Sequence, residues 1–269
     1  MSELDLHETH AHLHEIARQA GVVVMDYFNQ PHEETTKANI FDIATAGDKA
    51  SEKIIVEALQ NMYPDHHIVG EEGGGYDALA DEAEYFWYID PIDGTSNYAN
   101  GIPHFAISIA VTNRDNMPLV GIVFNPARDE LYAAIRGHGA TLNDAPIHVS
   151  SKESLSQSII ATGFPHSHSE KLTENMNEWD TFLTYGVRGM RRFGSAALEL
   201  CWVANGRLEA YWERYLNPWD CLAGILCVEE AGGHVSDFSG TTTHAYTGEQ
   251  VLASNNHVHE EMRRLLNGA

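Results

Sequence analysis

The sequence predicts a mixed α/β protein, and three observations support this class. Apolar residues at helical spacing dominate residues 6–62. Strand-like segments separated by short turns follow at residues 105–135, which is the pattern of an antiparallel meander. Strand-like and helix-like segments then alternate to the end of the chain, which is typical of an α/β unit.

The chain length permits one large domain or two small ones. It has 269 residues, of which 43% are hydrophobic, and this is ample for a packed core. Residues 137–144 are rich in turn-forming glycine, asparagine and aspartate. We therefore predict an N-terminal α+β domain at residues 1–145 and a C-terminal α/β domain at residues 146–269.

The first predicted helix covers residues 6–29 and ends before Pro31. His7, His10 and His14 share one face of it and could bind a transition metal. We prefer a solvated helix end, because no carboxylate or cysteine completes a ligand set. A second helix follows Asp48, which can cap it and still serve a function.

The remaining elements follow from short apolar runs and the turns between them. Strands are expected at residues 67–69, 86–90, 105–112, 119–124, 130–135, 158–162, 186–193, 208–212 and 251–254. Helices are expected at residues 169–183, 194–204, 221–231 and 258–266.

The central motif is Asp90-Pro91-Ile92-Asp93-Gly94-Thr95, at the end of an apolar and aromatic strand. Pro91 lacks a backbone donor, so we expect the sheet ladder to stop there. The two carboxylates and the Ile92 carbonyl suit a hard cation such as Mg²⁺, and the helix start that follows suits an anion. The motif thus fits a phosphate-ester site, although an Asp-x-x-Asp pair at a turn is also the usual pattern of a surface helix cap.

A second acidic motif, Gly70-Glu71-Glu72-Gly73-Gly74-Gly75, follows the strand at residues 67–69. Glycines allow backbone or side chains to approach a ligand closely. Taken alone, these residues are interpreted as a mobile acidic loop, so the motif indicates a site only beside the others.

The net charge of the chain limits the kinds of molecule it is expected to bind. The chain has 16 Lys and Arg against 39 Asp and Glu, a formal net charge of −23, which argues against nucleic acid or an anionic membrane. A phosphorylated substrate would need metal ions to offset this field. The sequence has no apolar run of membrane-spanning length, no signal-like start, and three cysteines without metal or redox spacing, so we expect a cytoplasmic protein.

The motifs together resemble a known family. Residues 87–100 resemble the first signature of the inositol monophosphatase family, and Gly70-Glu71-Glu72 lies at the expected place ahead of it. Trp219-Asp220, with a helix ending Glu230-Ala231-Gly232-Gly233, resembles the second signature. The order and spacing agree from Lys37 to Asn256. Leu222 departs from the small residue usual there, which puts local helix packing in doubt rather than metal binding.

The resemblance implies a layered αβαβα sandwich, usually a homodimer, and lithium-sensitive, Mg²⁺-dependent hydrolysis of a phosphate monoester with two or three ions per site. Carried over, the metal ligands are Glu71, Asp90, the Ile92 carbonyl, Asp93 and Asp220, with Glu72 contributing through water. Thr95 and Asp48 would activate the attacking water, with Glu71 in a catalytic role. Substrate contacts would come from Asp93, Gly94, Thr95, Ser195, Ala196 and Glu213.

The leading prediction is hydrolysis of inositol 1-phosphate, which Glu213 and the segment Gly194-Ser195-Ala196 favour. One alternative is a related phosphatase acting on fructose 1,6-bisphosphate, histidinol phosphate or 3′-phosphoadenosine 5′-phosphate. Another is a regulatory partner of the transcription machinery. His66, His67 and His104 are interpreted as structural, whereas Arg188, Arg191 and Arg192 would pair across a dimer or receive a second phosphate.

Overall fold

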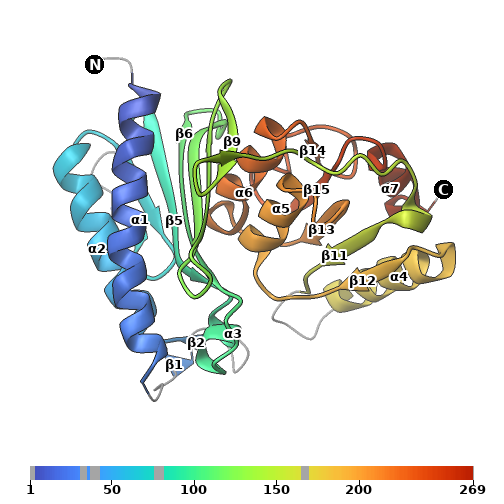
Figure 1. Cartoon of the computed structure of the whole chain (residues 1–269), viewed down its shortest axis with the longest axis horizontal. Coiled ribbons are helices and arrows are strands. Elements are labelled where there is room, and N and C mark those ends of the chain that lie inside the picture. The colour runs from blue at the N-terminus through green and yellow to red at the C-terminus, as the bar shows by residue number, and fades with distance from the viewer. Residues whose placement is uncertain (1–3, 31–34, 37–42, 76–81, 165–169, 269) are drawn as a thin grey trace.

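The computed structural model describes residues 4–30, 35–36, 43–75, 82–164 and 170–268. Its elements stack as helices, sheet, helices, sheet, helices (Figure 1). The predicted mixed α/β class and the αβαβα layering are therefore confirmed. The division into two domains stays a prediction.

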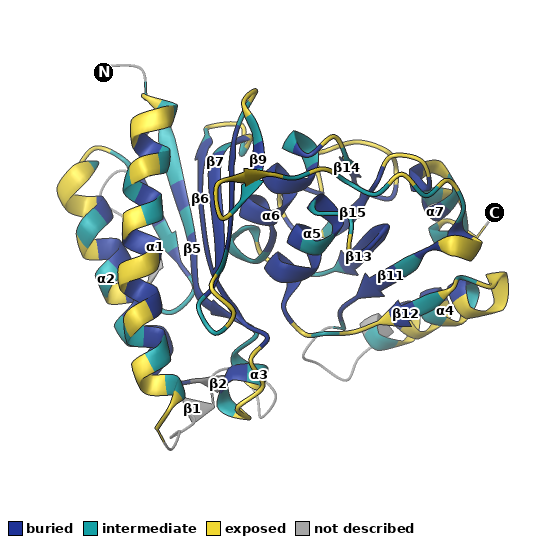
Figure 2. Ribbon diagram, in the orientation of Figure 1, coloured by how far each residue is buried: buried dark blue, intermediate teal, exposed yellow. Residues whose placement is uncertain are grey.

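The first layer contains α1 (Leu6–Phe28) and α2 (Ala46–Met62). Asp5 caps α1 by accepting hydrogen bonds from the amides of His7 and Glu8. Thr45 and Asp48 form a reciprocal capping box at the start of α2. Both helices follow the predicted apolar pattern, and Figure 2 shows their buried sides turned toward the sheet.

The first sheet has eight strands in the order β10-β9-β8-β7-β6-β5-β3-β4. These are β3 (His67–Gly70), β4 (Gly74–Gly75), β5 (Tyr85–Asp93), β6 (Ala106–Asn113), β7 (Pro118–Asn125), β8 (Glu130–Ile135), β9 (Gly139–Leu142) and β10 (Ala145–Pro146). The predicted meander is confirmed by the antiparallel pairing of β6 with β7 and of β7 with β8. Antiparallel β5 and β9 extend it on either side, where β9 was not predicted, whereas β3 and β5 are parallel. A separate ribbon pairs β1 (Thr35–Thr36) with β2 (Ile43–Ala44).

The end of β5 differs from the prediction. The ladder with β6 does not stop at Pro91, because pairing resumes between Asp93 and Ala106 after an irregularity that begins at Asp90. A bulge lets the strand omit the donor that proline lacks and continue beyond it. The expected helix after Gly94 is α3 (Thr95–Ala99), which is only five residues long.

The middle layer consists of α5 (Ala196–Ala204) and α6 (Pro218–Glu230), which are packed between the two sheets. Most residues of both helices are buried, because each helix has a sheet on either side. A Cβ at Gly121 of β7 would lie 2.9 Å from the Cα of Ala223, so small residues allow α6 to approach the first sheet closely. Leu222 is fully buried within this layer.

The second sheet has five strands in the order β12-β11-β13-β15-β14. They are β11 (Ile159–Thr162), β12 (Gly189–Arg191), β13 (Ala210–Arg214), β14 (His234–Ser236) and β15 (Gln250–Ser254). The outer helices α4 (Glu170–Tyr185) and α7 (His259–Leu266) cover its far face, and a 3₁₀ turn at Leu155–Gln157 precedes β11. The sequence missed β14 and overestimated the length of β12.

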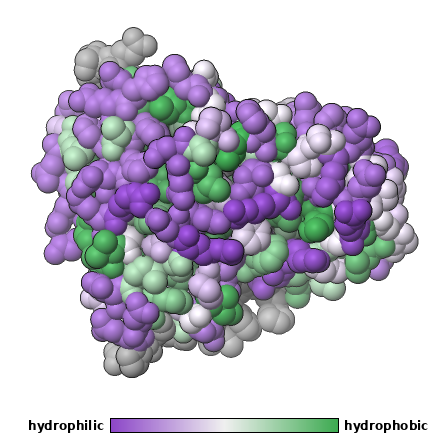
Figure 3. Space-filling model, in the orientation of Figure 1, coloured by the Kyte–Doolittle hydropathy of each residue, from purple (hydrophilic) through white to green (hydrophobic). Residues whose placement is uncertain are grey.

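The surface agrees with the acidic composition. Hydrophilic side chains cover most of the face shown in Figure 3, and the apolar side chains among them are scattered. Within the described residues, no helix is long and apolar enough to cross a membrane. His7 is exposed, its ring lies 4.5 Å from that of His138, and Nε2 of His14 lies 3.8 Å from Asp144.

Candidate active site

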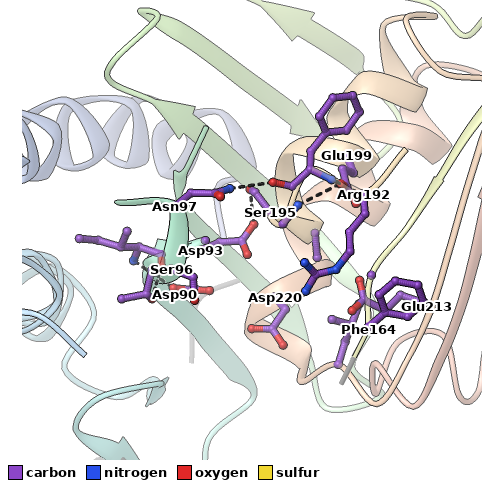
Figure 4. A pocket seen from close by; sticks show the side chains of 18 of the residues that line it. Asp90, Asp93, Ser96, Asn97, Phe164, Arg192, Ser195, Glu199, Glu213 and Asp220 are labelled. Carbon is purple, nitrogen blue, oxygen red and sulfur yellow. Dashed lines mark hydrogen bonds between the residues drawn. The ribbon is translucent and has the colours of Figure 1, made fainter. Parts of the chain in front are cut away.

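A cleft of about 340 Å³ opens between the first sheet and the second half of the chain. Nearly all the predicted site residues line it: Glu71, Asp90, Ile92, Asp93, Gly94, Thr95, Ser195, Ala196, Glu213 and Asp220. Figure 4 shows that Asp90 and Asp93 come from one side of this cleft, and that Arg192, Phe164 and Glu213 lie opposite them. Residues more than a hundred positions apart in sequence thus face one space.

The bulge at the end of β5 positions the two aspartates. Asp90 is 2% exposed, and its Oδ1 accepts a hydrogen bond from the Ile92 amide at 3.0 Å. Oδ2 of Asp93 accepts bonds from Ser195 Oγ at 2.6 Å and from the Ala197 amide at 2.8 Å. Asp93 thereby ties the first sheet to the start of α5.

Asp48 lies behind the cleft and contacts Thr95. Oγ1 of Thr95 lies 3.3 Å from Asp48 Oδ1 and donates to the Ile92 carbonyl at 3.0 Å. The other oxygen of Asp48 accepts from the amide and hydroxyl of Thr45, at 2.7 and 2.5 Å. Complete burial raises the pKa of Asp48 to about 6, although the bonds from Thr45 oppose the shift.

Asp220 enters from the second half of the chain, in the first turn of α6. Its Oδ2 accepts a hydrogen bond from the Asn217 amide at 2.7 Å, as part of a capping box. Capping fixes the side chain toward the cleft, where Asp90, Asp93 and Glu71 also lie. Glu71, on the loop after β3, is partly buried.

Electrostatics in the cleft are unfavourable for this many carboxylates. Burial raises the pKa of Asp93 to about 7, and burial followed by the charges of Glu71, Asp93 and Asp220 raises the pKa of Asp90 well above its usual range. Burial, followed by the charges of Asp93 and Glu71, also raises the pKa of Asp220 well above its usual range. Such crowding is typical of sites that bind cations.

The opposite wall contains Glu213, which is 8% exposed. The Tyr211 hydroxyl donates a hydrogen bond to it, and a Cβ at Gly163 would lie only 2.1 Å from its oxygens. Burial raises the pKa of Glu213 to about 7, partly opposed by the hydrogen bond from Tyr211 and then by the charge of Arg192. Arg192 stacks over the ring of Phe164 at 5.5 Å, so this wall combines an acid, a cation and an aromatic ring.

Among the cleft residues that the sequence did not reveal, Glu199 and Asn97 make the clearest structural contacts. Glu199 is 1% exposed and accepts bonds from the amides of Phe193 and Gly194, which shapes the turn before Ser195. Asn97 donates to the carbonyls of His104 and Phe193 at 2.8 and 2.7 Å, which joins α3 to the same turn. A single acid inside the apolar segment 196–204 was the available signal for Glu199.

Other predicted residues lie outside the cleft. Glu72 lines a neighbouring pocket with Glu52 and is absent from the lining of the cleft. His104 is buried against Phe193 and Trp202, and burial lowers the pKa of His104 to about 4, which fits a neutral packed ring. Arg188 and Arg191 are exposed.

The donor set can be tested against magnesium. Carboxylate oxygens and a main-chain carbonyl are the ligands that Mg²⁺ prefers, and the cleft supplies both. Within the described residues, no three His, Cys, Asp or Glu side chains are already gathered to hold a metal ion, including the N-terminal histidines. The residues that line the cleft nevertheless fit the ion in their chemistry.

Buried acids at a strand end, next to the first turn of a short helix, suit the handling of a phosphate group. The αβαβα layering and this cleft together define a protein of the phosphatase class.

The family is shown by sequence: the chain belongs to the inositol monophosphatase family, whose model matches residues 5–268. Two relatives are similar in sequence to this chain along most of their length. The Nus factor SuhB of Haemophilus influenzae is 41% identical over 93% of this chain and 92% of its own. The inositol-1-monophosphatase of Synechocystis is 40% identical over 92% of this chain and 84% of its own.

Solved structures agree. The inositol monophosphatase of Anabaena superposes with a TM-score of 0.85 at 37% identity, covering 99% of this chain and 98% of that one. The extragenic suppressor protein suhB of Bartonella henselae gives a TM-score of 0.88 at 34% identity, covering 95% and 97%. A Staphylococcus aureus structure at 30% identity and a TM-score of 0.79 is described as inositol monophosphate bound, covering 97% of this chain and 94% of its own.

Proposed function

We propose that this protein hydrolyses a phosphate monoester in a Mg²⁺-dependent reaction, with inositol 1-phosphate as the substrate. The observation that carries the proposal is that acids from both halves of the chain line one cleft, beside the start of a short helix. Phosphate-ester hydrolysis needs charge neutralisation and in-line positioning more than covalent help from the protein. The cleft offers groups for both.

The proposed metal ligands are the acids of the cleft and one carbonyl. Glu71, Asp90 and the Ile92 carbonyl would hold a first ion, and Asp90, Asp93 and Asp220 a second, with Glu71 serving a weaker third. When bound, Mg²⁺ offsets the charge of the phosphate and lowers the pKa of a coordinated water. Mutual repulsion of these acids, described above, is relieved by the same cations.

Thr95 and Asp48 would orient the attacking water and accept its proton. The 3.3 Å separation of their oxygens permits a relay from Thr95 Oγ1 to Asp48 Oδ1. A pKa of about 6 makes Asp48 a better proton acceptor near neutral pH than an ordinary aspartate, since its value lies nearer the working pH. The amides of Gly94 and Thr95 would hold the phosphate; because α3 is so short, these individual N–H groups matter more than a helix dipole.

The leaving alcohol would face Ser195, Ala196 and Glu213. A buried carboxylate such as Glu213 accepts hydrogen bonds from neighbouring hydroxyls of a polyol and repels a second phosphate. This favours inositol 1-phosphate over a bisphosphate, although Arg192 also lines the cleft. Fructose 1,6-bisphosphate, histidinol phosphate and 3′-phosphoadenosine 5′-phosphate are the alternatives that a substrate panel must include.

The test is release of inorganic phosphate from this panel, with Mg²⁺, with a chelator, and with added Li⁺. We expect turnover of inositol 1-phosphate only with Mg²⁺, and inhibition at roughly tens of millimolar Li⁺, a small hard cation. Activity that survives chelation would contradict metal dependence. Faster turnover of another panel member would reassign the substrate while leaving the reaction class in place.

The second candidate function is regulation of transcription through a protein partner. Its support is the relative named Nus factor SuhB, and the net charge of −23 disfavours direct RNA binding but permits a protein contact. Capture of transcription proteins at moderate salt by both the wild-type chain and an inactive Asp90→Asn variant would support it. Absence of such capture would leave the phosphatase alone.

Oligomeric state, location and domain division belong to the same proposal. We expect a homodimer in the cytoplasm, as the family resemblance implies, with domains at residues 1–145 and 146–269. Light scattering of the purified protein measures the first, and a mass of one chain would contradict it.

A further inference from the structure

The buried face of α2 carries three polar residues in its first two turns, ahead of the apolar residues that continue it. Asp48, Ser51 and Glu52 follow one another at helical spacing and are 0%, 0% and 3% exposed. Asp48 belongs to the proposed proton relay, but Ser51 and Glu52 have no part in it. Burying a polar side chain costs folding free energy unless it is hydrogen-bonded, so the partners of Ser51 and Glu52 indicate what these residues do.

The carboxylate of Glu52 binds the main chain of the acidic loop. Oε2 of Glu52 accepts a hydrogen bond from the Glu72 amide at 2.9 Å, and the Gly73 amide also donates to this carboxylate. On its other side the Glu71 amide donates to the Ile89 carbonyl of β5 at 3.1 Å. The loop that contains Glu71 is therefore held from both sides.

Gly70 permits this arrangement. A Cβ at position 70 would lie 2.6 Å from Oε2 and 2.8 Å from Cδ of Glu52, closer than real Cβ atoms approach. The glycine before the two acids thus makes room for the buried carboxylate. Glycine at this position serves contact with α2, in addition to any freedom it gives the loop.

Ser51 contacts the end of β5, on the Asp90 side of the cleft. Its Oγ donates to the Pro91 carbonyl at 3.2 Å, within the bulge between Asp90 and Asp93. Consecutive residues of one helix therefore contact the loop of Glu71 and the corner of Asp90. Because a helix is stiff over one turn, these contacts set the separation of two main-chain segments whose acids must converge.

We propose that Glu52 is a positioning residue, which holds the loop of Glu71 at the distance from β5 where Glu71 and Asp90 can share a cation. This inference deepens the proposed function and rests on it, since it assumes that these two acids bind metal. Partners that orient metal ligands without touching the metal change metal affinity by about 10–100-fold when they are removed. Ser51 supports the same geometry from the β5 side.

Three variants of the full chain test the role. Glu52→Ala removes both amide contacts, Glu52→Gln keeps an acceptor oxygen without the charge, and Glu57→Ala is the control. Glu57 lies on the same helix, pairs with Lys53 at 3.8 Å and has a 62% exposed side chain, so its replacement changes the net charge equally. The readouts are Mn²⁺ binding by calorimetry, hydrogen exchange of residues 71–73, and the Mg²⁺ concentration at half-maximal phosphatase activity.

For Glu52→Ala we expect Mn²⁺ affinity about 10–100-fold weaker and faster exchange of the Glu72 and Gly73 amides, with substrate KM little changed. Glu52→Gln should recover at least part of both effects, and Glu57→Ala should match the wild type. Reduced thermal stability with unchanged Mn²⁺ affinity would show a merely structural role and overturn the proposal.

These measurements distinguish failure of the positioning role from failure of the proposed reaction. If Mn²⁺ binds and Glu52→Ala weakens it, but no phosphate monoester is hydrolysed, the positioning role stands and the proposed reaction is wrong. If the wild type hydrolyses its substrate and Glu52→Ala has the same Mg²⁺ requirement and amide exchange, the positioning role is wrong and the reaction stands.

Discussion

Two buried aspartates, Asp93 and Asp237, show opposite electrostatics in the same chain. They are 8% and 0% exposed, so desolvation acts on both. Asp93 accepts two hydrogen bonds within a cleft of other acids, and burial raises its pKa to about 7. Hydrogen bonds from Ser239 and Thr241 outweigh burial at Asp237 and hold its pKa well below the usual range.

The opposite pKa shifts distinguish a candidate binding site, around Asp93, from a purely structural turn, around Asp237. Around Asp237, main-chain amides and hydroxyls satisfy the charge, so this turn is complete without a ligand. Around Asp93, neighbouring acids add negative charge that the protein does not neutralise, so the cleft gains from an added cation. Burial alone cannot tell the two apart, whereas the balance of donors and like charges can.

The largest expected effect is at Asp90, which is proposed to contact two ions. Asp90→Asn should lower kcat/KM on the order of 10⁴-fold, since a metal supplies several kcal/mol of transition-state stabilisation. It should not lower the melting temperature in chelator, because one repelling charge is gone. Phosphate release and thermal unfolding measure both; near-normal turnover in a folded variant would contradict the two-metal proposal.

Thr95→Ala tests the proton relay to Asp48. Because the hydroxyl is proposed to act in the transition state, kcat should fall on the order of 10²–10⁴-fold with little change in KM. Steady-state kinetics on inositol 1-phosphate with saturating Mg²⁺ is the measurement. A change in KM alone would reassign Thr95 to phosphate binding.

Glu213→Gln tests the opposite wall of the cleft. We expect use of inositol 1-phosphate to weaken by about 1–3 kcal/mol, the cost of losing hydrogen bonds to a charged group. A plain aryl phosphate has no matching hydroxyls, so its hydrolysis should barely change. Equal losses on the two substrates would remove Glu213 from the specificity site.

Asp237→Asn tests the structural turn in this comparison. At pH 7 it should destabilise the fold by about 1–3 kcal/mol while activity and Mg²⁺ dependence remain. The folded pKa of Asp237 lies below its ordinary 3.8, so its stabilising effect is present above that value and is lost as the pH falls toward the folded pKa. Urea unfolding at pH 7 and near pH 3 should therefore show the gap closing; a constant gap would mean that charge plays no part.

The fold was largely accessible from sequence because its long elements have strong periodic patterns. The helices α1 and α2 and the strands β6 to β8 follow their apolar spacing closely. The two-residue strands β1, β2, β4 and β10 were missed, since so short a pairing leaves no period to detect. Pro91 lacks a backbone donor, as expected, but the prediction that the ladder ends there was wrong. A bulge lets the pairing with β6 resume at Asp93.

The site was predicted as a set of residue types and only partly as a geometry. Most of the motif residues line one cleft, whereas Asp48 and Glu72 do not, and the roles assigned to all of them stay predictions. Glu52 was missed because its contact with Glu72 lies twenty positions away and leaves no local motif. A signal did exist: Glu52 lies three residues before Ile55 on the apolar face of its helix, and a charged residue there needs a buried partner.

The placement of the cleft between the two sheets has a consequence for how such proteins diversify. On the proposed roles, the phosphate is handled mainly by residues 45–95, and the alcohol by the segment 163–213. Gene duplicates can therefore change their alcohol by altering the second segment while inheriting the first intact. The hydrogen bonds from Ser195 and Ala197 to Asp93 limit that freedom, because they place two inherited positions inside the variable half.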